Sequence, residues 1–343
     1  MLSRDVYFWL AAMLAAMTPT AVFVDPLRQN ISALRPIVAA RSKVLHDFAG
    51  LRLRHQRLQS EMLAMRPVAG LRITLVSPSS HTPYSGMLPG MVAGHYNFEQ
   101  AHIDLARLCQ WAGARFITAE VVALDPAART LSLKGRPGIE YDYVSIDIGS
   151  QPELDSVPGA RDHAVPVKPV ASLWQRWENL RQRLDHQPPE RKHRIAVVGG
   201  GAGSVELALA MAHRLAGRPV ALGLWCGGPA IVPGYNAGAR RSVTAALQRL
   251  GVSLTLNARV AQVAANSMQL ADGSAVGFDE LFWCTGAAAA LWVAASGLAV
   301  DPQGFRGITD TLQSVDDGRV FGAGDIATQL NHPRPKAGVF AVR

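Results

Sequence analysis

The stretch Ile195-Ala-Val-Val-Gly-Gly-Gly-Ala-Gly-Ser-Val-Glu-Leu-Ala208 joins a short β-branched run to an alanine-rich segment through four glycines. The run has the composition of a buried strand, and the alanine-rich segment that of a helix. Gly199 would make the tight turn out of the strand. Gly201 has no Cβ, so a pyrophosphate could approach the backbone at the helix N-terminus, where free N–H groups favour an anion. Ser204 replaces the third glycine of the usual fingerprint. The stretch predicts a dinucleotide-binding turn, with an ordinary glycine-rich connection as the alternative.

Composition limits the classes of protein to consider. The 343 residues are 49% hydrophobic and 17% charged, a globular composition whose length suggests two domains of about 150 residues each. The net charge is +8, carried mostly by arginine and without a dense basic run. This balance fits anionic cofactors or lipid headgroups better than nucleic acid, so no nucleic-acid partner is expected.

Cysteines and histidines offer no special chemistry. Cys109, Cys226 and Cys284 form no C-x-x-C motif and are odd in number, which argues against a disulfide framework and a local redox dithiol. The histidines lack metal-ligand spacing, so no metal site is expected.

Strand-like and helix-like segments alternate along most of the chain. Helices are expected at 103–112, 170–185 and 237–250, a loop at 77–96, and a polar linker at 187–193. Strands are expected at 72–76, 116–117, 120–124, 130–133, 142–148, 195–198, 220–225, 252–257, 260–263, 268–270 and 281–284. Alternation of this kind predicts a parallel sheet whose two faces are covered by helices.

Residues 1–61 differ in texture from the rest. Val6 to Val24 is nineteen residues without a charge. Three interpretations remain open: a membrane span or signal anchor, a buried or interfacial helix, or sequence foreign to the fold.

Two further glycine motifs stand at ends of predicted strands, and a third stands alone. Ile148-Gly149 and Thr285-Gly286 each close a strand that begins near an acidic residue, and Gly324-Asp325 stands near the C-terminus. Together with four other stretches, these motifs carry a resemblance. The four stretches are Thr82 to Gly90, Val165 to Pro169, Pro233 to Tyr235 and Pro333 to Val339.

The chain resembles the FAD/NAD(P)-dependent pyridine nucleotide-disulfide oxidoreductase superfamily over about residues 62–343. More closely, it is similar to the NADH-dehydrogenase-like (type II) subgroup associated with selenide, water dikinase. The resemblance implies an α/β fold with two doubly wound Rossmann-like domains, the NAD(P) domain (190–286) being inserted in the FAD domain (62–165 and 287–343). It also implies FAD and NAD(P)H as cofactors, and hydride transfer from NAD(P)H to flavin. Electrons would then pass to a small acceptor such as a quinone.

The resemblance also implies roles for individual residues. Gly199, Gly201, Gly203 and Glu206 would receive NAD(P)H, and Thr285-Gly286 would lie against a nucleotide. Lys168 and Lys336 would lie near the isoalloxazine ring, where a cation stabilises the reduced flavin anion. The residues expected to contact FAD are Thr82, Pro83, Tyr84, Ser85, Gly86, Val121, Ile148, Gly149, Gly324 and Asp325.

The sequence departs from the family pattern in two places. Where the first FAD glycine turn is expected, the chain has only His46-Asp-Phe-Ala-Gly50, and it ends at Arg343 inside a stretch that the family continues. The first departure suggests that residues before about 62 are foreign to the fold, and the second suggests C-terminal truncation. A catalytically silent nucleotide-binding remnant, or an interaction partner in selenium metabolism, is therefore the alternative. A membrane-anchored oxidoreductase using residues 6–24 is a third interpretation.

The preferred donor is suggested by charge. NAD specificity usually needs an acid about 20 residues beyond the glycines, yet residues 207–271 contain no Asp or Glu. Arg214, Arg218, Arg240 and Arg241 fall in this window, so we expect NADPH to be accepted at least as well as NADH. A cytoplasmic location is expected, with association with the inner membrane surface and a homodimer left open.

Overall fold

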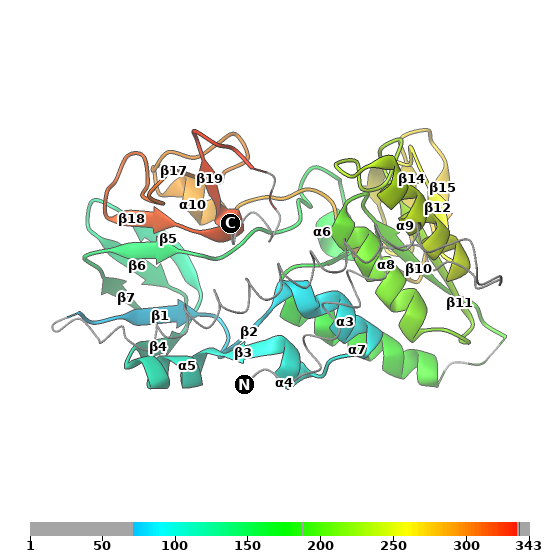
Figure 1. The fold of residues 1–343 in the computed structure, drawn as a ribbon, viewed down its shortest axis with the longest axis horizontal. Helices are drawn as coiled ribbons and strands as arrows, with labels where there is room; N and C mark the ends of the chain where they lie inside the picture. The colour runs from blue at the N-terminus through cyan, green and yellow to red at the C-terminus, as the bar shows by residue number, and fades with distance from the viewer. Residues whose placement is uncertain (1–70, 187, 189, 335, 337–343) are drawn as a thin grey trace, which may run out of the picture. The chain divides into compact units, whose positions relative to one another are not determined.

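The computed structural model describes residues 71–186, 188, 190–334 and 336 (Figure 1). The chain divides into two compact units, the first of which includes, among the described residues, only 71–74 and 109–115. The second includes 75–108 and everything from 116 onward, and it carries most of the elements discussed below, while 74, 109–112 and 115 of three short elements belong to the first. The predictions made for residues 6–24, 46–50 and the rest of 1–61 lie outside the described residues.

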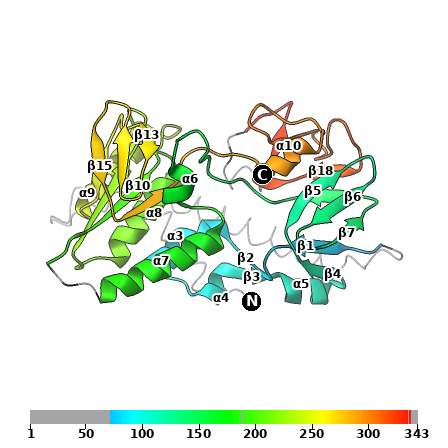
Figure 2. The same ribbon diagram turned by 180° about the vertical axis from the view of Figure 1, so that it is seen from behind.

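A five-stranded parallel sheet is the centre of the second unit, and it confirms the predicted α/β class. The strand that precedes the glycine turn, 193–198, pairs along its whole length with the strand at 220–225, from His193 opposite Val220 to Val198 opposite Trp225. Figure 2 shows the sheet and its helices from behind. In spatial order, the strands are β12 (Ser253–Thr255), β11 (Val220–Trp225), β10 (His193–Val198), β16 (Glu280–Trp283) and β9 (Val165–Pro166).

Helices α7 (Val170–Asp185), α8 (Ala202–Arg214) and α9 (Ala237–Arg249) belong to this sheet. In α7, Leu173, Trp177 and Leu180 are fully buried at spacings of four and three residues, which is the stripe of an amphipathic helix. In α8, small side chains such as Ala208 let the helix pack closely on β10. These contacts form the largest core of the described chain.

An antiparallel meander of β13 (Val260–Val263), β14 (Ser267–Leu270) and β15 (Ala275–Gly277) lies between β12 and β16 in sequence. The sequence predicts its first two strands but not β15. Val260, Met268 and Leu270 of the meander share a second core with Trp283 of the parallel sheet.

The remaining strands form small sheets. Strands far apart in sequence meet here: β8 (Val144–Ile146) pairs in parallel with β18 (Val320–Gly322). The second meander is β5 (Val121–Asp125), β6 (Thr130–Leu133) and β7 (Arg136–Glu140). The other pairs are β1 (Thr74–Ser77) with β4 (Arg115–Thr118), β2 (His81–Pro83) with β3 (His102–Asp104), and β17 (Arg306–Ile308) with β19 (Ala327–Gln329).

Short helices complete the described fold. They are η1 (Ser85–Met87), α3 (Leu88–Ala93), α4 (Phe98–Ala101), α5 (Leu105–Ala112), α6 (Ala160–His163), α10 (Leu291–Ala295) and η2 (Gly324–Ile326). In the described ranges, no helix combines the length and apolar character needed to cross a membrane.

Two expectations about residues 77–112 are wrong. Residues 77–96 are not a loop throughout, because β2, η1 and α3 lie within them. Helix α3 forms because Pro89 stands in its first turn, Met91 and Val92 are buried, and Gly94 ends it in the left-handed conformation. Helix α5 begins at Leu105, two residues later than expected, because Ile103 pairs with Thr82 in β3.

Two chain segments connect the parallel sheet with the strands around β8 and β18. Gln151 and Ala288 exchange both backbone hydrogen bonds, at 2.9 and 2.8 Å, so the two connections run antiparallel to each other. The two connections therefore lie side by side at this point of the chain.

A buried carboxylate fastens α7 to the sheet. The Glu280 side chain is 1% exposed, and its Oε2 lies 3.0 Å from Nε of Arg176. Its Oε1 accepts a second hydrogen bond from Arg183, seven residues further along α7. Both arginines remain half-exposed, so only the acid is buried.

We expect Glu280→Gln to lower the free energy of unfolding by about 2 kcal/mol, because two charge-assisted hydrogen bonds to a buried group are weakened. Urea unfolding followed by tryptophan fluorescence measures this. Glu178→Gln, which removes the partly exposed pair with Arg181 within α7, is the control and should cost less than about 0.5 kcal/mol. Equal losses in the two variants would contradict the assignment.

Candidate functional site

The glycine turn leaves the carboxyl end of β10 and enters α8. Helix α8 begins at Ala202, with Gly201 as an extended N-cap residue. Gly199 has φ +151°, and a Cβ there would lie 2.9 Å from Cβ of Ser204 and 3.1 Å from Cβ of Cys284. Ser204 fits the third-glycine position because it is buried and its hydroxyl donates to the carbonyl of Gly201 at 2.7 Å.

The other glycines of the turn face different surroundings. A Cβ on Gly200 would lie 2.4 Å from Sγ of Cys226, so close packing against β11 requires glycine there. Gly201 and Gly203 instead face open space within 4 Å of a Cβ position. The turn therefore presents a bare backbone and a helix N-terminus to solvent, which suits the approach of a phosphate group.

Three other predicted residues lie near the glycine turn: Thr285 and Gly286 at the same edge of the sheet, and Glu206 on α8. Gly286 has φ +65°, and Glu153 occupies the space where its Cβ would lie, at 2.8 Å. The carbonyl of Thr285 accepts a hydrogen bond from the Glu153 N–H at 3.2 Å. Glu206 lies on the solvent-facing side of α8, and partial burial of its carboxylate raises its pKa.

Lys168 follows edge strand β9 and joins a polar cluster that the sequence does not reveal as a whole. Its Nζ lies 3.0 Å from Oδ2 of Asp325 and 3.1 Å from Oγ of Ser150. The Ser150 hydroxyl also donates to Oδ2 of Asp325, at 3.1 Å. The Lys168–Ser150–Asp325 cluster therefore joins two predicted residues with a serine that sequence reasoning missed, although it directly follows Gly149.

A second carboxylate borders this cluster. A Cβ on Gly324, which has φ +70°, would lie 2.7 Å from Oδ1 of Asp147. Burial and then the negative charge of Asp325 raise the pKa of Asp147. Asp147 was not predicted as a site residue.

Lys336 lies near Asp325. Its Nζ is 4.1 Å from the centroid of the Phe305 ring and donates to Oγ1 of Thr328 at 2.7 Å. Burial lowers the pKa of Lys336, while the charges of Asp301 and Asp325 oppose that effect. Both predicted lysines thus contribute positive charge around Asp325.

The other predicted residues occupy separate elements. Thr82 and Pro83 lie in β2, Ser85 and Gly86 in η1, and Val121 at the start of β5. Tyr84 and Ile148 are 57% and 49% exposed, and Gly149 has φ +69° with open space beside it. Among the described residues, no hydrogen bond joins the 82–86 segment to the Lys168–Ser150–Asp325 cluster, and the Tyr84 N–H donates to Ala101 instead.

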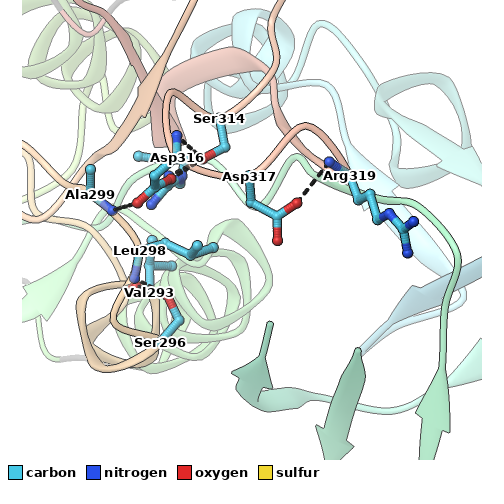
Figure 3. Close-up of polar contacts among 9 residues, drawn as sticks. Val293, Ser296, Leu298, Ala299, Ser314, Asp316, Asp317 and Arg319 are labelled. Atoms are coloured by element: carbon cyan, nitrogen blue, oxygen red, sulfur yellow. Dashed lines mark hydrogen bonds and ion pairs between the residues drawn. The ribbon is translucent and has the colours of Figure 1, made fainter. Parts of the chain in front are cut away.

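A fully buried arginine supports the strands that precede Gly324. Arg306 is 0% exposed and donates to Ser314 and Asp316. Figure 3 shows Asp316 turned toward Ser314 on one side and the backbone of Ala299 on the other. Burial alone would raise the pKa of Asp316, but the hydrogen bonds from Ser314 and Ala299 and the Arg306 charge hold it below its usual value. This ion pair stabilises β17 beneath the Gly324-Asp325 turn.

A family model for pyridine nucleotide-disulphide oxidoreductases matches residues 57–342. The chain belongs to this family. The glycine turn and the Gly324-Asp325 turn both lie within the matched range. The predicted resemblance to the pyridine nucleotide-disulfide oxidoreductases is thereby confirmed.

Members of this family with curated names are similar at low identity. Demethylphylloquinone reductase NdbB of Synechocystis sp. is 26% identical over 224 residues, covering 62% of this chain and 54% of that protein. The type II NADH:quinone oxidoreductase of Haemophilus influenzae is 24% identical, covering 56% and 50%. The chain therefore spans about half the length of the curated relatives it matches.

Solved structures confirm the oxidoreductase fold. NDH2 from Plasmodium falciparum in complex with NADH has a TM-score of 0.67 at 16% identity, covering 75% of this chain and 59% of that one. The NAD-dependent persulfide reductase from A. fulgidus has a TM-score of 0.66 at 17% identity, covering 80% and 53%.

We expect Gly200→Ala to lower the free energy of unfolding by about 2 kcal/mol, because the added methyl overlaps Cys226 Sγ in a packed interior. Gly203→Ala is the matched control. It adds a methyl to open space inside a helix, so it should leave stability unchanged or raise it by up to about 1 kcal/mol. Thermal and urea unfolding measure both variants, and a large loss in Gly203→Ala would contradict the open geometry.

Proposed function

We propose that this protein is an FAD-dependent NAD(P)H oxidoreductase that passes electrons to a quinone or another small acceptor. The observation that supports it most strongly is the bare glycine turn of Gly201 and Gly203 at the N-terminus of α8, in a chain of this family. In open parallel sheets, ligands bind outside the carboxyl ends of the strands, which is where this turn lies.

The donor would bind across this edge. The N–H groups of the first turn of α8 would hold the pyrophosphate of NAD(P)H. Gly201 and Gly203 would allow close approach, and Thr285-Gly286, after β16, would line the neighbouring strand end. Glu206 would sit one turn into the helix.

The residues around Asp325 have features that would suit a flavin. Gly149 leaves open space and Ile148 is exposed, as residues that cover a nucleotide would be before it binds. In the described part of the chain, no hydrogen bond engages Oδ1 of Asp325, so this oxygen would accept one from a ribityl hydroxyl. Tyr84 and the rest of the 82–86 segment, with Val121, would make the remaining contacts. FAD, when bound, accepts hydride from nicotinamide and releases electrons to the acceptor.

The lysines would set the charge around the flavin. Lys168 holds Asp325 in one orientation and balances its charge, while Lys336 adds a second cation. The sequence has no C-x-x-C pair that would relay the electrons. Cys284 is enclosed beside the glycine turn, and burial raises the pKa of its thiol, so it would remain a poor nucleophile.

Finer aspects of the proposal rest on the resemblance. We propose domain boundaries at 62–165 with 287–343, and at 190–286, in keeping with the paired connections at Gln151 and Ala288. We also propose membership of the subgroup associated with selenide, water dikinase, on the motifs quoted above. A cytoplasmic enzyme that meets quinone at the inner membrane surface, as a homodimer, is the arrangement we favour.

The flavin is the first thing to test, because the sequence before residue 71 has no G-x-G-x-x-G turn. We expect the purified chain, after incubation with FAD and gel filtration, to show bound-flavin absorbance that NADPH or NADH bleaches and a soluble quinone restores. A colourless protein that FAD does not reconstitute would favour the silent remnant.

We expect Lys168→Met to lower the midpoint potential of the bound flavin, because the reduced flavin anion would face Asp325 and Asp147 without the neutralising cation. Redox titration against dyes measures the shift. Lys134→Met, which removes a lysine paired only with exposed Glu120, is the control and should leave the potential unchanged. A potential unaffected by Lys168→Met would remove Lys168 from the flavin site.

A further inference from the structure

A cavity beside the glycine turn is not explained by the functions proposed so far. It has a volume of about 400 Å³ and lies between α9, edge strand β12 and the chain that leaves β11. Ala230, Ile231, Leu254 and Leu256 give it apolar walls, and Arg240 and Arg241 of the second turn of α9 add two guanidinium groups. Such walls suit a ligand with a flat apolar part and an anionic group.

The residue at the end of β11 differs from what NAD binding requires. In dinucleotide-binding folds, an acid near this strand end accepts hydrogen bonds from the ribose hydroxyls. Here Cys226 follows Trp225, is 3% exposed and lies 3.5 Å from the carbonyl of Ala230 through its sulfur. Because residues 207–271 contain no acid, no carboxylate from this part of the sequence can take that role.

A third arginine, Arg259, stands near the end of β11. The N–H of Cys226 donates to Thr255 at 2.8 Å, and the N–H of Ala258 donates to Cys226 at 2.9 Å. These bonds hold the exits of β11 and β12 together. They place Arg259 beside Gly227, where a Cβ would lie only 3.6 Å from the Arg259 Cα.

The structure separates the four arginines expected from the sequence. Arg218 pairs with Asp185 at 2.6 Å and precedes β11, and Arg214 ends α8 with its guanidinium 2.7 Å from a Cβ position on Gly94. Both lie toward the amino edge of the sheet, opposite the glycine turn, so they do not belong to a nucleotide site there. Arg240 and Arg241 lie near the carboxyl edge.

Charge pairing differs between the two edges. At the amino edge, Asp279 pairs with Arg191 and Arg194 at 3.5 Å, and Arg218 is paired as described. Within the described ranges, no ion pair involves Arg240, Arg241 or Arg259. These three arginines therefore keep an unneutralised positive charge next to the missing acid.

We propose that Arg240 and Arg241 bind the 2′-phosphate of NADPH, with the adenosine against the apolar walls of the cavity. Arg259 does not line the cavity, but it follows β12 beside Gly227 and would add its positive charge to the same site. Guanidinium groups bind phosphates through paired, charge-assisted hydrogen bonds, and the absence of a carboxylate removes the repulsion that makes NAD sites reject NADPH. The inference rests on the proposed function, because it assumes that the α8 turn binds the pyrophosphate. It specifies NADPH as the donor.

Binding of nucleotide fragments tests this without a flavin. Isothermal titration calorimetry of the full chain would compare adenosine 2′,5′-bisphosphate with 5′-AMP, which differ only in the 2′-phosphate. We expect the bisphosphate to bind at least about tenfold tighter, the effect of one or two charge-assisted hydrogen bonds. The double variant Arg240→Gln/Arg241→Gln should remove most of that preference, Arg259→Gln should remove part of it, and both should leave 5′-AMP affinity unchanged.

Arg249→Gln is the matched control, since Arg249 ends the same helix outside the cavity. It should keep the full preference, and unfolding curves show that each variant is folded. Equal affinity of the wild type for both fragments would overturn the inference while leaving the proposed function intact. A preference that survives in the double variant Arg240→Gln/Arg241→Gln would overturn it too. Failure of both fragments and of NADPH to bind would instead overturn the donor site of the proposed function.

Discussion

Close backbone packing around the exit of β10 is the constraint on which the rest of the structure depends. Gly199 lies against Cys284, which follows β16, and Gly200 lies against Cys226, which follows β11. Neither glycine has room for a side chain, so the three central strands end at one level. Because parallel strands direct their carboxyl ends to the same edge, this packing fixes where α8 begins and where every neighbouring loop leaves the sheet.

Lys168 links the parallel sheet to the Lys168–Ser150–Asp325 cluster. Strand β9 pairs with β16 at Val165 and Pro166, and Lys168 follows two residues later. Its ammonium forms an ion pair with the Asp325 carboxylate. The register of the parallel sheet thus determines the position of a cation at the Gly324-Asp325 turn, some 157 residues away in sequence.

The sequence was informative where one local rule decides the structure. Helix α7 and strands β6, β11 and β13 follow directly from their apolar spacing, and the glycine turn follows from its residue pattern. Long-range pairings were beyond such rules. Nothing near Ile103 shows that it will pair with Thr82, and nothing near Ser150 shows that Lys168 and Asp325 will converge on it. The buried Arg306 contradicts the expectation that arginine stays in water, because its partner Asp316 becomes a neighbour only after β17 and the following turn have formed.

The two edges of the parallel sheet carry different charged groups. The acids at the start of β16, Asp279 and Glu280, are each bonded to arginines. Glu153 and Glu206 lie instead near the carboxyl edge. That edge also carries the positive end of the α8 dipole, and arginines that form no ion pair within the described part of the chain. On the carboxyl edge, the bare backbone of Gly201 and Gly203 is therefore the place where a phosphate can come closest. A single acid after β11 would reduce this field, which makes the cysteine at position 226 as important to the electrostatics as any of the arginines.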